Sequence, residues 1–215
     1  MRPRRLSSIP APESAPISRA RLHQLSSEIV EIQRALPSRP PEEDDDVAVP
    51  STIPSGGWAR MARILVEIAV HHVVVRDVEA ARRAADDALL LIDLMAAEPV
   101  QQAELSLSLG EVLLEVHASE RARERFEVAV AVFDQRRDRA SAARARVGLS
   151  RAMASLGDPV ARAVLEDAGT AFEELGDDDA VRAIDVELRE VTASFDESPA
   201  SFQAVSPRSA ARVKV

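Results

Sequence analysis

Residues 109–133, LGEVLLEVHASERARERFEVAVAVF, decide the fold, because they join two helical patterns through one short turn. Before the turn, one helix face carries Ser106, Leu109, Gly110 and Leu113. After it, apolar residues follow at steps of three and four, at Ala122, Phe126, Ala129 and Phe133. Ser119 can cap the second helix by accepting hydrogen bonds from its free amides. The stretch predicts an antiparallel hairpin of two helices.

The same pattern occurs once before and once after this hairpin. Its second helix corresponds to Ala81, Ala85, Ala88 and Ile92 in the preceding copy and to Ala161, Leu165, Ala168 and Phe172 in the following copy. The first helix corresponds to Leu65, Ile68, Ala69 and His72 and to Arg146, Leu149, Ser150 and Met153. A small residue recurs at Ala69, Gly110 and Ser150, which lets paired helices approach closely.

Residues 57–194 as a whole predict an all-α body of seven helices. The segment is rich in Ala, Leu, Arg and Glu, and it lacks the sustained alternation of apolar and polar residues that marks strands. Capping signals mark the expected boundaries, at Asp77, Pro99, Ser119, Gly157 and Gly176. Because the turns are short, we expect antiparallel neighbours. The last helix carries Val181, Ile184, Leu188 and Val191.

Prolines and charges divide the chain into three regions. Residues 1–56 hold nine of the 13 prolines, and residues 195–215 hold Pro199, Pro207 and several serines. We expect the first region to be largely disordered and the last to be a flexible tail. The formal net charge of -9 arises in the body, residues 57–194, because the two ends carry -1 and +1.

The series Leu109-Gly110, Ala122, Phe126 and Ala129, with Gly157-Asp158, Ala161, Leu165 and Ala168, resembles tetratricopeptide repeats over about residues 58–175. The period of 39–41 residues is longer than the usual 34, and the consensus Trp and Tyr are absent. The resemblance implies antiparallel helical hairpins stacked as a right-handed solenoid, with about three repeats and a C-terminal capping helix. An ordinary helix bundle without true repeats is the alternative.

Composition and motifs exclude several function classes. The chain has no Cys, and its four His include no metal-binding pair such as H-E-x-x-H. An acidic body disfavours nucleic-acid binding, and no apolar run is long enough to span a membrane. No secretory signal follows the basic start. We therefore expect a non-enzymatic cytoplasmic protein without cofactor or metal. Twenty-six Arg against one Lys indicate a GC-rich bacterial genome.

By resemblance, the first helix of each hairpin lines a concave groove that holds a peptide or an amphipathic helix of another protein. The predicted groove residues are Val66, Val70, Val73, Val74, Glu104, Leu107, Glu111, Leu114, Arg144, Val147 and Arg151, with Glu115 and Ala154 beside them. An alternative use of the charges is structural: Glu104 and Glu111 would pair with Arg144 and Arg151 across adjacent helices.

A separate amphipathic helix is predicted within residues 18–36, which contain no proline. Its seam consists of Leu22, Leu25, Ile29, Ile32 and Leu36. Such a helix is too short to be stable alone, so it is expected to fold back into its own groove, pair with a second copy, or dock on another protein.

Three functions follow from these patterns. The first is an adaptor or scaffold that binds a protein segment in its groove. The alternative is a structural subunit that forms a homo-oligomer or a larger complex through the 22–36 helix. A weaker alternative is a detached ligand-sensing repeat domain.

Overall fold

The computed structural model describes residues 19–35, 55–93 and 98–196, and every regular element in these ranges is an α-helix. The all-α prediction is therefore confirmed for the described residues. Of the first region, expected to be largely disordered, residues 1–18 and 36–54 lie outside these ranges, and so do residues 197–215 of the expected tail. Leu36 of the predicted amphipathic helix also lies outside them. The helices are α1 (Arg19–Ala35), α2 (Ser55–Val74), α3 (Val78–Asp93), α4 (Pro99–Glu115), α5 (Ser119–Arg136), α6 (Arg139–Ser155), α7 (Ala161–Leu175) and α8 (Asp178–Asp196).

Among the described residues, five turns between helices share the same backbone conformation. One residue in each turn adopts a left-handed conformation with φ between 58° and 74°, at Arg76, His117, Arg137, Gly157 and Gly176. The next amide then donates to the carbonyl five positions earlier, as from Asp77 to His72 at 2.9 Å. The turns at Arg76, His117 and Gly157 are almost evenly spaced along the chain, with steps of 41 and 40. The sequence repeat therefore coincides with the places where the chain reverses.

Aspartates cap several of the helices that follow these turns. Asp77, Asp138 and Asp177 accept hydrogen bonds from the amides three positions later, at 3.0–3.1 Å. The predicted cap at Asp77 is confirmed, whereas the one at Ser119 is wrong. The turn at His117 makes Ala118 the capping residue, so Ser119 already lies inside α5, which has no side-chain cap.

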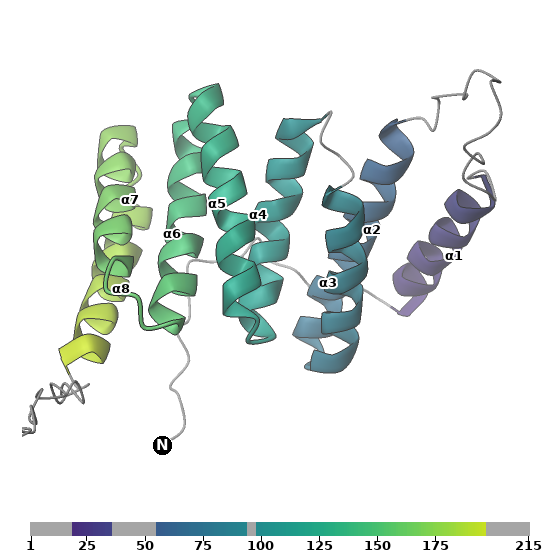
Figure 1. The fold of residues 1–215 in the computed structure, drawn as a ribbon, viewed down its shortest axis with the longest axis horizontal. Coiled ribbons are helices and arrows are strands. Elements are labelled where there is room, and N and C mark those ends of the chain that lie inside the picture. Colours follow the sequence, from purple (N-terminus) through teal and green to yellow (C-terminus); the bar gives the residue numbers. More distant parts are fainter. Residues whose placement is uncertain (1–18, 36–54, 94–97, 197–215) are drawn as a thin grey trace, which may run out of the picture.

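The helices stand side by side in a row from α1 to α8 (Figure 1). Consecutive helices pack against each other, and α2 also packs on α4 and α4 on α6. Within the described residues, no comparable contact joins α3 to α5 or α5 to α7. Arg121 and Arg125 of α5 instead reach α3 through Asp86 and Asp93. The helices α2, α4 and α6 therefore form the more closely packed side of the row.

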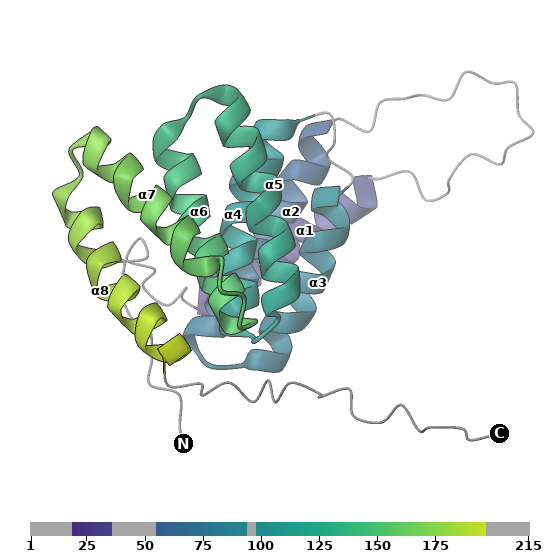
Figure 2. The ribbon, with the colours of Figure 1, turned by 60° about the vertical axis from the view of Figure 1, so that its left-hand side comes forward.

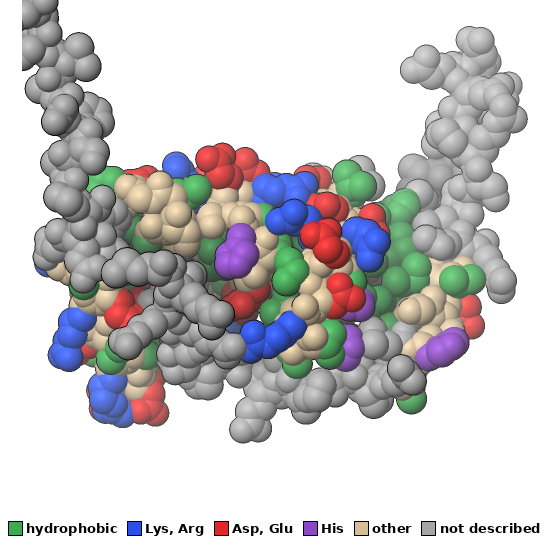
Figure 3. All heavy atoms as spheres, turned by 90° about the horizontal axis from the view of Figure 1, so that it is seen from below, with side chains coloured by type: hydrophobic (Ala, Val, Ile, Leu, Met, Phe, Trp, Pro, Cys, Tyr) green, Lys and Arg blue, Asp and Glu red, His purple; other side chains and the backbone are tan. Residues whose placement is uncertain are grey.

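Both ends of the row are visible when the molecule is turned (Figure 2), with α7 and α8 at one end and α1 behind α2 at the other. Seen from below the view of Figure 1, acidic, basic and apolar side chains are interspersed over the visible part of the surface (Figure 3). Among the described helices, none combines the length and apolarity needed to cross a membrane.

The ring of Phe126 on α5 fills the space between α4 and α6. Phe126 is fully buried, and a Cβ added to Gly110 would lie 2.7 Å from its Cζ atom. A Cβ added to Gly148 on α6 would lie 2.3 Å from its Cε1 atom. The ring thus touches two helix backbones where no side chain intervenes. Phe133 and Phe172, which occupy matching places in the repeat, are also buried.

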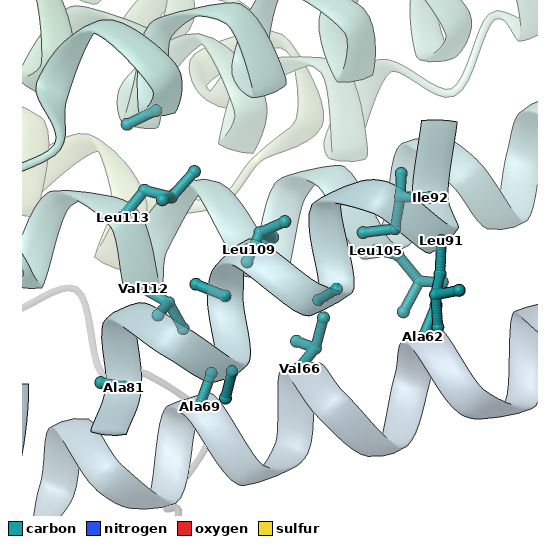
Figure 4. Close-up of a cluster of buried hydrophobic side chains, with 14 of the residues drawn as sticks. Ala62, Val66, Ala69, Ala81, Leu91, Ile92, Leu105, Leu109, Val112 and Leu113 are labelled. Carbon is teal, nitrogen blue, oxygen red and sulfur yellow. The ribbon is translucent and has the colours of Figure 1, made fainter. Parts of the chain in front are cut away.

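The rest of the core is mainly aliphatic. Side chains of α2, α3 and α4 interlock around Val66, Ile92 and Leu109 (Figure 4). A second cluster joins α6, α7 and α8 through Val147, Leu165 and Ile184. The predicted small residues Ala69, Gly110 and Ser150 are all buried, so paired helices do approach closely there.

We predict that Gly148→Ala lowers the free energy of unfolding by about 2 kcal/mol, because the new methyl group overlaps the Phe126 ring. Urea denaturation followed by circular dichroism measures the change. The cost should shrink in a Phe126→Leu background, because the smaller side chain leaves room for the methyl group.

The matched control is Gly169→Ala on α7, whose Cβ would lie 3.4 Å from Ile184, an ordinary contact. This variant should match the wild type or gain up to about 1 kcal/mol from the better helix propensity of Ala. If Gly148→Ala unfolds at the same urea concentration as Gly169→Ala, the ring does not occupy the space described.

Candidate functional site

The predicted groove residues differ in how far they reach solvent. Val66 and Val147 are only 5% and 2% exposed, and they belong to the core clusters. In this structure both predicted groove residues are therefore core residues. Both helices are rotated so that these valines point between helices, as Figure 4 shows for Val66.

The other apolar residues of the predicted groove are partly accessible. Val70, Val73, Leu107 and Leu114 are half-buried and pack against the core between α2, α3 and α4. Val74, at the end of α2, is 40% exposed. These five residues give α2 and α4 an apolar surface that remains in contact with solvent.

A stripe of carboxylates runs along α4. Glu104, Glu111 and Glu115 follow each other at steps of seven and four, so they share one helix face, and all three are exposed. Within the described part of the chain, none of them has an ion-pair partner within 4.0 Å. Arg144 on α6 is exposed and likewise without such a partner among these residues. The predicted pairing of Glu104 and Glu111 with Arg144 and Arg151 is therefore absent at ion-pair distance.

Arg151 is instead bound by Glu187 of α8. Its Nε donates to Oε1 at 2.6 Å and its Nη2 to Oε2 at 2.9 Å, a two-pronged arrangement typical of strong Arg–carboxylate pairs. The Glu187 side chain is only 8% exposed. The sequence analysis missed Glu187, although its place between Ile184 and Val191 on the buried face of α8 could have signalled a paired charge.

The charges on α4, α6 and α8 form one electrostatic network. The Glu111 side chain reaches solvent, but the surrounding helices remove part of the water around its carboxyl and so raise its pKa. The positive charges of Arg144 and Arg151 act in the opposite direction and lower this pKa. Desolvation alone would lower the pKa of Arg151. The hydrogen bond to Glu187 and the charges of Glu187, Glu111 and Glu115 outweigh it, and the pKa of Arg151 is raised.

These residues form the even-helix face. We define it as the accessible side chains on one side of α2, α4 and α6: Val70, Val73, Val74, Glu104, Leu107, Glu111, Leu114, Glu115, Arg144 and Arg151. The steps of 41 and 40 that relate the turns also relate Val70, Glu111 and Arg151, which therefore occupy equivalent places. The same place on the face is therefore a valine on α2, a glutamate on α4 and an arginine on α6.

Helix α1 lies beside α2 at the end of the row (Figure 1). It packs on α2, with Leu25 fully buried and Ile29 partly buried. Glu28 accepts a hydrogen bond from Arg60 at 3.0 Å, and Arg21 pairs with Glu67 at 3.4 Å. The sequence predicted that this helix packs within its own chain, on a second copy or on another protein. In the structure it packs within the chain, on α2 at the end of the row. The side chains of Leu22 and Ile32 lie outside the described part.

Other polar features lie away from the even-helix face. His71 is buried and His72 half-buried, with ring centroids 5.7 Å apart. Two open hollows of about 500 and 360 Å³ are lined mainly by charged side chains of α5 to α8, among them Arg162, Asp185 and Arg146. Among the described residues, no three side chains are placed to hold a metal ion.

No protein-family model matches the chain, and the curated proteins include no similar sequence.

We predict that Arg151→Met lowers the free energy of unfolding by about 3 kcal/mol, because it leaves the Glu187 carboxylate buried without its partner. Urea denaturation at neutral pH measures this loss. Arg162→Met is the matched control, since Arg162 forms an exposed pair with Glu166 that should contribute less than about 1 kcal/mol. Equal losses of unfolding free energy in the two variants would contradict a stabilising role of the buried Arg151–Glu187 pair.

We predict that Glu111→Gln is more stable than the wild type at neutral pH. The pKa of Glu111 is raised above its ordinary value of 4.5, so the folded chain binds this proton more tightly than the unfolded chain does. Wild-type stability therefore falls as pH rises through the interval above 4.5. The Glu111→Gln variant does not lose stability as pH rises through this interval. Its higher stability relative to the wild type should therefore disappear at pH values below 4.5.

Thermal denaturation across the pH range measures the effect. Glu124→Gln on the exposed surface of α5 controls for the removal of one negative charge. An equal gain in both variants would mean that net charge, and not the surroundings of Glu111, is responsible.

Proposed function

We propose that this chain is a non-enzymatic adaptor that binds a segment of another protein on its even-helix face. The observation that carries the proposal is the composition of that face, where half-buried valines and leucines lie beside exposed charges without ion-pair partners among the described residues. Surfaces that bind other chains combine such apolar centres with charged groups that set specificity. The adaptor would act in the cytoplasm.

We further propose that the helices form a right-handed, tetratricopeptide-like solenoid of three hairpins with α8 as the capping helix. Two observations support this arrangement: the turns at Arg76, His117 and Gly157 recur at a nearly constant interval, and α2, α4 and α6 pack together more closely than α3, α5 and α7 do. A row with one closely packed side curves toward that side. The even-helix face would then be concave, and a concave surface can surround a bound segment.

An amphipathic helix suits this face better than an extended peptide. Leu107 and Leu114 lie one heptad apart along α4, and Val70 and Val73 lie one turn apart along α2. Apolar anchors at helical spacing on two neighbouring helices match the anchors of a third helix laid between them. The charges of Glu104 and Arg144 would fix its direction.

To test the function, we would capture partners from the source organism with the full chain and with a Val74→Glu, Glu104→Arg double variant. Both residues are exposed, so the variant should fold as the wild type does. We expect it to recover at least tenfold less of the partner, since an apolar contact and a charge contact are both lost.

The control is Val78→Glu, Leu90→Glu on α3, which changes exposed apolar residues outside the even-helix face. It should retain the partner. Equal recovery by both double variants would remove the even-helix face from the binding function.

A further inference from the structure

Paired and unpaired carboxylates occur on both sides of the row within the described residues, as Glu187 and Glu124 show. On the odd-numbered helices, Asp86 and Asp93 pair with arginines of α5, and Glu174 of α7 pairs with Arg139. On α4, within the described residues, the carboxylates of Glu111 and Glu115 have no such pair. Arg151, whose charge acts on both, donates both prongs of its guanidinium to Glu187. This part of the even-helix face therefore keeps a negative charge that no ion pair neutralises within the described residues.

The surroundings of Glu111 also oppose its charge in part. The surrounding helices disfavour its charged form, as its raised pKa shows, and Arg144 and Arg151 compensate for only part of that effect. Within the described residues this charge forms no ion pair, so the fold satisfies it only in part. Incompletely satisfied groups of this kind are common where a surface is shaped for binding.

Apolar side chains flank these carboxylates on one side. By the repeat that relates the turn at Arg76 to the turn at His117, Val70 and Val74 of α2 occupy the places that Glu111 and Glu115 occupy on α4. Val73 and Leu114, also equivalent, pack against the same core cluster. A segment lying between α2 and α4 would therefore contact valines on one side and carboxylates on the other.

We propose that Glu111 and Glu115, together with the valines of α2, bind a basic amphipathic helix of the partner protein. This inference rests on the proposed function and specifies the chemistry of the partner. The bound helix presents leucine-like residues to Val70, Val73 and Val74 and presents arginine or lysine to the two carboxylates. Steps of four along both helices let two basic residues one turn apart meet the two glutamates, which are also one turn apart.

The test uses a synthetic amphipathic peptide of about 18 residues, long enough for five helical turns, with leucines on one face and arginines along its edge. Fluorescence anisotropy measures its binding to the full chain. We expect Glu111→Gln, Glu115→Gln to weaken binding about tenfold at low salt, and the same peptide with Glu in place of Arg to bind no better than that variant does.

The matched control is Glu124→Gln, Glu173→Gln, which removes two exposed carboxylates from α5 and α7 and changes the net charge equally. It should bind the basic peptide as the wild type does. Thermal denaturation of both double variants shows whether any loss of binding comes from unfolding. Equal binding by the two double variants, or by the two peptides, would overturn the proposal.

Two further outcomes separate the alternatives. If the peptide binds only after residues 197–215 are removed, the basic segment containing Arg208, Arg212 and Lys214 covers the face, and the proposal of a partner helix is overturned. If the native partner is lost by the Val74→Glu, Glu104→Arg variant but retained by Glu111→Gln, Glu115→Gln, the adaptor function stands and the basic chemistry of the partner is wrong.

Discussion

The Phe126 ring sets the spacing of the helices on which the even-helix face depends. The ring projects from α5 and meets the backbones of α4 and α6 at Gly110 and Gly148, where no side chain separates them. Because α4 and α6 also pack against each other, the carboxylates of one helix lie within electrostatic range of the arginines of the other. A buried aromatic contact in the middle of the row thus determines the geometry of a charged surface.

Charge is used for two purposes in this molecule. Long arginines bridge α3 and α5, whose backbones do not pack closely, and Arg151 joins α6 to α8 through a nearly buried carboxylate. These pairs connect helices. The stripe on α4 forms no ion pair within the described chain, although the charges of Glu111 and Glu115 act on Arg151. Within the described residues, Glu124 and Glu173 are also exposed and also without an ion pair, so the half-buried valines of α2 beside Glu111 and Glu115 are what set this surface apart.

Local signals predicted the helices well because each depends on a few neighbouring residues. Asp77 caps α3, Pro99 opens α4 and Gly176 ends α7, as their chemistry requires. The candidate site was harder to predict, because it depends on how each helix is rotated and on contacts between distant residues. Equivalent places in the repeat hold buried Val66 and half-exposed Leu107, and Glu187 lies 36 residues from the arginine it binds.

Every substantial contact between described helices joins elements at most two places apart in the chain. Such a molecule behaves as a one-dimensional series of coupled units, in which each unit is held by its neighbours and the end units are held on one side only. Opening should therefore start at α1 or α8 and advance inward, and the interface around Phe126 should be the last to exchange its amide hydrogens. A segment bound across α2, α4 and α6 would clamp several units together and make the middle of the series unfold as one.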